Sequence, residues 1–173
     1  MFKKSGKLSG LILMMLSLSI IGVSAFVYDQ ASHTISQTII NVATITVKNS
    51  ALGNIEEGET KGYSKLNVTS LGNIINITSV KDGIFLHFDS DVDSLDTYYD
   101  TYNIIVKFAA VGSGSSHSVG DTACTLSLLS PDSSVTLDKL GSWRFDFEIT
   151  TTALGVSADQ GTTVTINVTA ESS

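Results

Sequence analysis

One stretch of the chain, residues 143–150, alternates strictly between apolar and polar side chains. The apolar members are Trp143, Phe145, Phe147 and Ile149, and the polar members are Arg144, Asp146, Glu148 and Thr150. A period of two puts the two sets on opposite faces of an extended chain, whereas a helix would mix them. The stretch therefore predicts a strand with one dry face, and the fold must supply a second apolar layer to cover that face.

The same alternation recurs elsewhere. Further strands are expected at 84–89, 104–110, 123–129 and 163–169, separated by turn signals such as Lys81-Asp82-Gly83 and Asp159-Gln160-Gly161. From Thr34 onward the chain is rich in Thr, Val and Ile, and it has no long apolar stripe at helical spacing. The sequence predicts an all-β chain folded as a two-sheet sandwich.

Length and composition limit the alternatives. With 173 residues, the chain has room for one ordinary domain. Its formal net charge of -7 repels phosphate backbones, so nucleic acid is not an expected partner. Cys124 is the only cysteine, which excludes an internal disulfide and a CxxC redox pair.

The first 25 residues have the features of a secretory signal. Lys3, Lys4 and Lys7 precede an apolar run at 11–23 and a small-residue cleavage site ending at Ala25. The apolar run is shorter than the roughly 20 residues that span a bilayer. We expect 1–25 to be removed, leaving an N-terminal segment at 26–36 and a β-sandwich domain at 37–173. The protein would then be extracellular or on the cell surface, with membrane contact only during export.

A rival interpretation places the cut after Gly10. The apolar helix would then be retained in the mature chain, as in type IV pilins and archaellins.

Signatures of enzymes are absent from the sequence. There is no HExxH zinc motif, no GxSxG nucleophile elbow and no phosphate-binding GxxxxGK[ST] loop. His33, His87 and His117 are widely separated, and Cys124 lies in an apolar, strand-like context. We expect a protein that is not an enzyme and needs no cofactor, with calcium as the one ion to consider.

That ion is suggested by a group of acidic residues, Asp89, Asp91, Asp93, Asp96 and Asp100. Carboxylate oxygens are ligands that calcium prefers. The spacing departs from the helix-loop-helix calcium pattern, which has Gly at the sixth position and Glu at the twelfth, where this chain has Ser94 and Asp100. A metal-free acidic loop is the alternative.

Three Asn-x-Ser/Thr sequons, at Asn67, Asn76 and Asn167, are candidate glycosylation sites in an exported chain. Each asparagine is flanked by two apolar residues, so period two points it away from the apolar face.

The segment after the expected cleavage site has large apolar groups but neither a helix signature nor a turn. Added to a sheet edge of another subunit, it would gain main-chain hydrogen bonds and fill pockets. Such a head-to-tail contact builds a filament unless it closes into a ring. Pairing within its own sheet is the alternative. The expected contact residues of this donor strand are Phe26, Val27, Tyr28, Ala31, His33 and Ile35.

These N-terminal residues also carry a resemblance. The run Ser-Ala-Phe-Val-Tyr-Asp-Gln-Ala-Ser at 24–32, followed by Thr-Ile-Thr-Val at 44–47, resembles the N-terminus of TasA and camelysin-type exported proteins, with Ala43 in place of their usual Gly. The parts at 52–60 and 66–72 resemble the turn and the strand that follow in that family. The resemblance covers residues 1–75.

The resemblance implies a jelly-roll-like β-sandwich with an N-terminal donor strand, secreted as a subunit of biofilm matrix fibres or archaeal bundling pili that form by donor-strand exchange. Its partners would be copies of itself, with neighbouring filaments bundling laterally for adhesion or biofilm cohesion. Camelysin relatives have been labelled metallopeptidases, but no zinc motif here carries that activity over. Archaeal cannula-forming proteins are similar in signal and β content, and their calcium-dependent assembly would suit the acidic group.

Overall fold

The computed structural model describes residues 41–155 and 161–172. The expected signal peptide at 1–25 and the expected donor strand at 26–36 lie outside the described residues, so both stay predictions. The sandwich domain expected at 37–173 is described from Asn41 onward, with the exception of 156–160 and 173.

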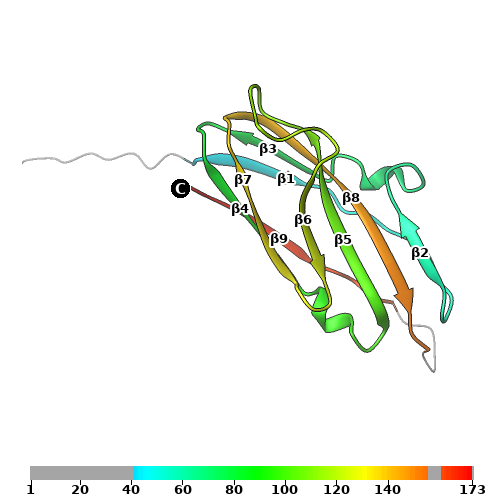
Figure 1. Cartoon of the computed structure of the whole chain (residues 1–173). Helices are drawn as coiled ribbons and strands as arrows, with labels where there is room; N and C mark the ends of the chain where they lie inside the picture. Colours follow the sequence, from blue (N-terminus) through cyan, green and yellow to red (C-terminus); the bar gives the residue numbers. More distant parts are fainter. Residues whose placement is uncertain (1–40, 156–160, 173) are drawn as a thin grey trace, which may run out of the picture. The chain divides into compact units, whose positions relative to one another are not determined.

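Two antiparallel sheets make up the described part of the chain, which confirms the all-β prediction (Figure 1). The small sheet has the order β7-β4-β9, with bounds Asp132–Leu137, Ile84–Ser90 and Ile166–Ser172. The large sheet has the order β1-β3-β8-β5-β6, and β2 pairs with the C-terminal half of β8. The bounds of these strands are Ala43–Val47 (β1), Thr60–Tyr63 (β2), Ile75–Ser79 (β3), Tyr99–Ala110 (β5), Thr122–Ser127 (β6) and Gly141–Ala153 (β8).

Two short 3-10 helices, η1 (Thr69–Leu71) and η2 (Val92–Leu95), connect strands. The described residues include no helix of the length and apolarity needed to span a membrane.

Alternation along the strands defines the inner faces as the sequence predicts. The apolar set of β8 is buried, and Ile84, Leu86 and Phe88 of β4 are completely enclosed. Phe85, which interrupts the apolar-polar alternation in the sequence, faces outward with 39% of its surface exposed. Leu129 is 98% exposed because β6 ends at Ser127, two residues earlier than expected.

Aromatic side chains join the two sheets into one core. The ring of Phe88 in the small sheet meets Phe145 of β8 edge-on, with centroids 6.2 Å apart. Phe108 of β5 lies 5.2 Å from Phe145 and 5.7 Å from Trp143. The indole Nε1 of Trp143 donates a hydrogen bond to the carbonyl of Lys139, so the largest core side chain has its polar atom satisfied.

Asp146 is on the outer face of β8, yet it is buried. Its carboxylate accepts hydrogen bonds from Lys65 Nζ at 2.5 Å and from the backbone N–H of Asn73 at 2.7 Å. The segment around η1 thus covers this part of the large sheet, and the charge is compensated rather than left unpaired.

The two ends of the sandwich are distinct. Asn41 leads into β1 at the end where Ala43 pairs with Ser79, which in turn pairs with Gly141 at the start of β8 (Figure 1). The opposite end is where Thr151 pairs with Tyr102. Because ten residue steps of β8 separate Gly141 from Thr151, these ends are about 33 Å apart.

Candidate functional site

The seam between β1 and β9 is open on the side where β1 ends and β9 begins. In β9, the inward-facing Ile166, Val168 and Ala170 are only half-buried, although the inward-facing residues of the adjoining β4 are enclosed. On β1, Val47 is 48% exposed. Among residues 41–155 and 161–172, no strand pairs with the outer edge of either β1 or β9. Within the described residues, the seam therefore has strand edges that no other strand covers, beside half-buried apolar side chains.

A cavity of about 710 Å³ opens from this seam into the space between the sheets. One wall is the chain at 47–53, which leaves β1, and the other is the chain at 162–168, which leads into β9. The floor consists of inward-facing residues of the large sheet, from Ile75 at the inner end to Thr151 at the outer end. We call this cavity the inter-sheet groove.

Hydroxyl groups gather at the outer end of the groove. Tyr102 of β5 is the cross-strand partner of Thr151 of β8. Tyr63 of β2 is the cross-strand partner of Ile149, which is two residues before Thr151 on β8. Burial, reinforced by Tyr99 and Tyr63, raises the pKa of Tyr102 to about 12. Its phenol is therefore a neutral hydrogen-bonding group at any physiological pH.

The hydroxyl of Thr151 has no hydrogen-bond partner in the described part of the chain. The residue is 2% exposed and lines the groove. Leaving a buried polar group unpaired costs about 1–3 kcal/mol. Thr151 is therefore a polar group of the groove floor whose hydrogen bond the described residues do not supply.

Two contacts hold the outer wall of the groove. Tyr99 Oη and Thr162 Oγ1 lie 2.9 Å apart and join β5 to the chain that leads into β9. The Tyr99 ring is braced edge-on by Tyr102, with centroids 5.0 Å apart. Asp91 Oδ1 accepts a 2.7 Å hydrogen bond from the backbone N–H of Thr165. The wall is thus fixed at both ends of its non-strand portion.

The acidic residues considered for calcium lie on several elements. Asp89 is in β4, Asp91 and Asp96 flank η2, Asp93 is within η2, and Asp100 is in β5. Within the described ranges, no three His, Cys, Asp or Glu side chains are grouped closely enough to hold a metal ion. Calcium binding stays a prediction, while the structure gives Asp91 a role in the groove wall.

Asp89 lies directly opposite Asp132 of β7. Partial desolvation, together with hydrogen bonding to and repulsion from Asp89, raises the pKa of Asp132. Two like charges at one cross-strand position are destabilising.

The three sequons differ in how their amides are used. Asn67 lies in a turn rather than a strand, where Oδ1 accepts from the N–H of Ser64 and Nδ2 donates to the carbonyl of Gly62. Asn76, on the central strand β3, donates to the carbonyl of Asn73. Asn167 is exposed on β9 and its side chain makes no hydrogen bond within the described residues. It is the sequon best placed to accept a glycan.

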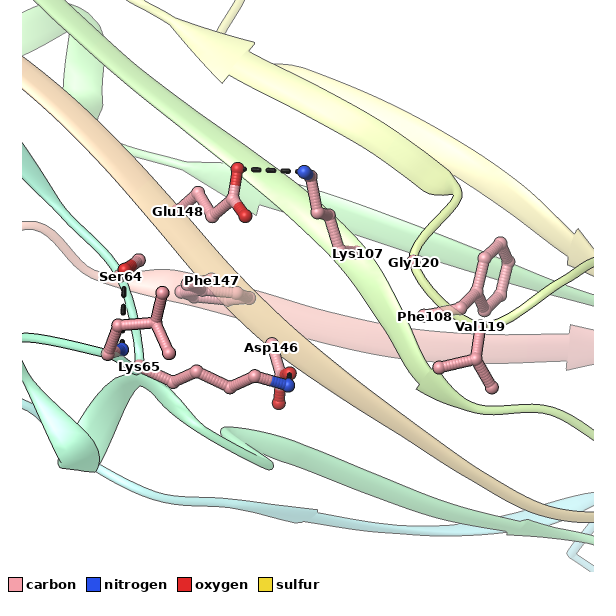
Figure 2. Close-up of a pocket in the computed structure, with 10 residues that line it drawn as sticks. Ser64, Lys65, Lys107, Phe108, Val119, Gly120, Asp146, Phe147 and Glu148 are labelled. Atoms are coloured by element: carbon pink, nitrogen blue, oxygen red, sulfur yellow. Dashed lines mark hydrogen bonds and ion pairs between the residues drawn. The ribbon is translucent and has the colours of Figure 1, made fainter.

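A second, smaller cavity of about 200 Å³ lies on the outer face of the large sheet. Figure 2 shows that its lysines are already paired: Lys65 reaches Asp146, and Lys107 reaches Glu148 at 2.9 Å. The cavity is smaller than the 300–1,000 Å³ typical of ligand pockets. We assign it no function.

The described histidines and the cysteine have structural contacts. His117 stacks on Phe108, with centroids 4.7 Å apart, and its Nε2 lies 2.9 Å from the carbonyl of Thr136. His87 lies 3.6 Å from Glu171 on the exposed face of the small sheet. Burial raises the pKa of the Cys124 thiol to about 11, so it stays protonated and is a poor nucleophile.

Every donor-strand residue expected from the sequence, namely Phe26, Val27, Tyr28, Ala31, His33 and Ile35, lies outside the described residues. The groove that could receive them was not predicted. One signal was present, because the apolar face of 143–149 continues in phase to Thr151, a polar residue at an inward position.

Comparison with known proteins adds no identification. The sequence matches no protein-family model and no curated protein.

Proposed function

We propose that the protein is a structural subunit of an extracellular filament, either a bundling pilus or a biofilm matrix fibre. It would be secreted after removal of residues 1–25, fold as a jelly-roll-like sandwich and polymerise head to tail by donor-strand complementation. Residues 26–35 of one subunit would occupy the inter-sheet groove of the next. The observation that carries the proposal is the open seam between β1 and β9, where apolar side chains and free strand edges lie together.

The positions of the two partners favour a chain of subunits. The donor segment precedes Asn41, which is at one end of the sandwich, and the outer end of the groove lies toward the other end. A subunit stacked beyond the groove would feed its donor segment inward from that end. Such a contact is heterologous, so it repeats without closing unless the rotation between subunits forms a ring.

This stacking also sets the strand direction. The C-terminal end of the donor would lie at the outer end of the groove, near Thr162, and its N-terminal end near Val168. Since β9 runs from Ile166 to Ser172, the donor would be antiparallel to β9. Antiparallel pairing is slightly the more stable arrangement. The donor would give the small sheet a fourth strand and bring it closer to jelly-roll architecture.

Binding of a neighbour's strand would stabilise the folded subunit, because the strand binds the folded state and not the unfolded one. This matters for a chain that has no internal disulfide and few charged residues. The acidic surface would keep filaments apart unless a divalent cation bridges them. A chelator is expected to disperse bundles and leave single filaments intact.

The test compares the mature chain with a variant that lacks 26–35, by electron microscopy and sedimentation of purified protein. We expect filaments from the mature chain and soluble, folded monomers from the variant. Filaments from the variant would refute donor-strand assembly. The same residues scrambled in order serve as a matched control, because they retain length and composition.

Two alternatives have their own measurements. Mass spectrometry of the exported protein reports its N-terminus: Phe26 supports the proposal, and Leu11 indicates a pilin or archaellin-like subunit with a retained helix. Folded monomers that bind calcium and never form filaments would instead indicate a calcium-dependent cell-surface tube or binding protein.

A further inference from the structure

We propose that the inter-sheet groove distinguishes the two faces of the donor strand. The inward face would be the even-numbered one, and its polar half would satisfy the Thr151 hydroxyl. This inference rests on the proposed function, since the occupant is residues 26–35 of a second copy. The inward residues would be Phe26, Tyr28, Gln30, Ser32 and Thr34. Of the contact residues expected from the sequence, Val27, Ala31, His33 and Ile35 would then face outward.

Charge excludes the other face. In an extended strand the odd-numbered side chains share one side, and that side includes Asp29. Among the described residues that line the groove, Lys48 is the only basic one, and it is exposed at the rim. An unpaired carboxylate in such a site is strongly unfavourable. With the even face inward, Asp29 stays in water.

Polarity along the groove matches polarity along the even face. The inner end is lined by aliphatic residues such as Ile75 and Val168, and the outer end by hydroxyl-bearing residues such as Tyr102 and Thr151. The even face changes in the same way, from Phe26 and Tyr28 to Gln30, Ser32 and Thr34. A donor antiparallel to β9 puts its aromatic half at the inner end and its polar half at the outer end.

The donor segment is long enough to span the groove from its inner end to its outer end. From Phe145, which pairs with Ile75, to Thr151, the floor of the groove follows six residue steps of β8. That is about 20 Å, or about six residues of an added strand. A ten-residue donor therefore covers both ends, with residues of its C-terminal half over Thr151.

A substitution at Thr151 should affect the stability of the free subunit and the strength of assembly differently, which a substitution at a purely structural residue would not do. Within a free subunit its buried hydroxyl has no partner in the described part of the chain, so the isosteric change Thr151→Val removes an unpaired group and is expected to stabilise the subunit. In the filament the same change removes a hydrogen bond. Stability of the subunit and strength of assembly should therefore move in opposite directions.

The first experiment introduces one aspartate at adjacent positions of the full mature chain. Ala31→Asp puts the charge on the outward face and should still give filaments, whereas Ser32→Asp puts it in the groove and should abolish them. The reverse result, or loss of filaments in both variants while the wild-type chain still forms them, would overturn the assignment of the face. Neither result would refute the proposed function. Filaments from both variants would show that the segment is not buried, which refutes the proposed function itself.

The second experiment measures the critical concentration for assembly of Thr151→Val against wild type. We expect an increase of about two- to tenfold, the equivalent of one net hydrogen bond. Thr151→Ser, which keeps the hydroxyl, should assemble as wild type does. Urea unfolding of Thr151→Val in the assembly-deficient Ser32→Asp chain should show a raised midpoint. An unchanged critical concentration would overturn the role of Thr151.

Discussion

Removing the hydrogen bond between Tyr99 and Thr162 tests whether this contact holds the wall of the inter-sheet groove in place. Tyr99→Phe removes only the hydroxyl and keeps the ring that braces Tyr102 edge-on at 5.0 Å. Thr162→Val removes the other oxygen and is nearly isosteric. Each change eliminates the same part-buried 2.9 Å hydrogen bond. Each should lower the free energy of unfolding by about 0.5–1.5 kcal/mol.

The double variant separates this contact from other effects. If the two hydroxyls act only on one another, the double change costs no more than one single change, and the coupling energy is about 1 kcal/mol. The assay is urea unfolding of four chains, all in the Ser32→Asp form, which is expected not to assemble. Tyr98→Phe is the matched control, because the Tyr98 hydroxyl takes part in no hydrogen bond within the described residues. Strict additivity of the two changes would refute the contact.

The consequence for assembly follows from the position of the contact. Thr162 belongs to the wall that the donor strand would touch, so a loosened wall should release the donor faster. We expect filaments of the double variant to shed subunits more rapidly on dilution than those of Tyr98→Phe. Equal rates would mean that the wall does not retain the strand.

Three further predictions concern stability. Gly112→Ala should destabilise the subunit by about 1–3 kcal/mol, because the new methyl group would lie 2.9 Å from the Leu140 carbonyl and 3.0 Å from the Trp143 ring. Gly62→Ala, with no atom within 4 Å of the new group, is the control, and equal thermal midpoints would contradict the steric argument. Hydrogen bonds from Ser115 and Ser116 lower the pKa of Asp138, so its contribution is present above pH about 4 and lost as pH falls toward the lowered pKa. Asp138→Asn should reduce stability at pH 7 and flatten the acid limb of a pH titration of the unfolding midpoint, and an unchanged limb would contradict this. Desolvation and Asp89 raise the pKa of Asp132, so its ionisation opposes folding as pH rises through that range, and Asp132→Asn should raise the unfolding midpoint at pH 7 but not at pH 3.

Alternation was a reliable guide wherever a strand has one covered face. Residues 143–150 gave β8 with every apolar side chain inward, because a shift by one residue would expose the whole set. The same rule failed at Asn67, where Leu66 and Val68 look like strand neighbours. That segment is a turn, and Leu66 is 90% exposed. The local pattern does not reveal that the side-chain amide of Asn67 hydrogen-bonds to the backbone N–H of Ser64 and to the backbone carbonyl of Gly62.

Strand ends and the groove were beyond prediction for a different reason. β9 begins at Ile166 although alternation starts at Thr163, because the chain there is fixed by Asp91 and Tyr99 instead of by a neighbouring strand. Both anchors are far from 162–165 in sequence. The sequence makes Asp91 either a candidate calcium ligand or part of a metal-free acidic loop. Its hydrogen bond to Thr165 depends on tertiary contacts that no local pattern contains.

If the seam between β1 and β9 takes up a strand as proposed, the direction of that strand would decide whether growth stops or continues. A subunit's own 26–35 segment, folded back at the Asn41 end, would enter antiparallel to β1 and parallel to β9. A neighbour's segment would enter in the opposite sense. The first occupant would make a dormant monomer, and the second would make a growing fibre. Exchange between them would appear as a lag before polymerisation, shortened by adding preformed fibre ends, which offer an empty groove.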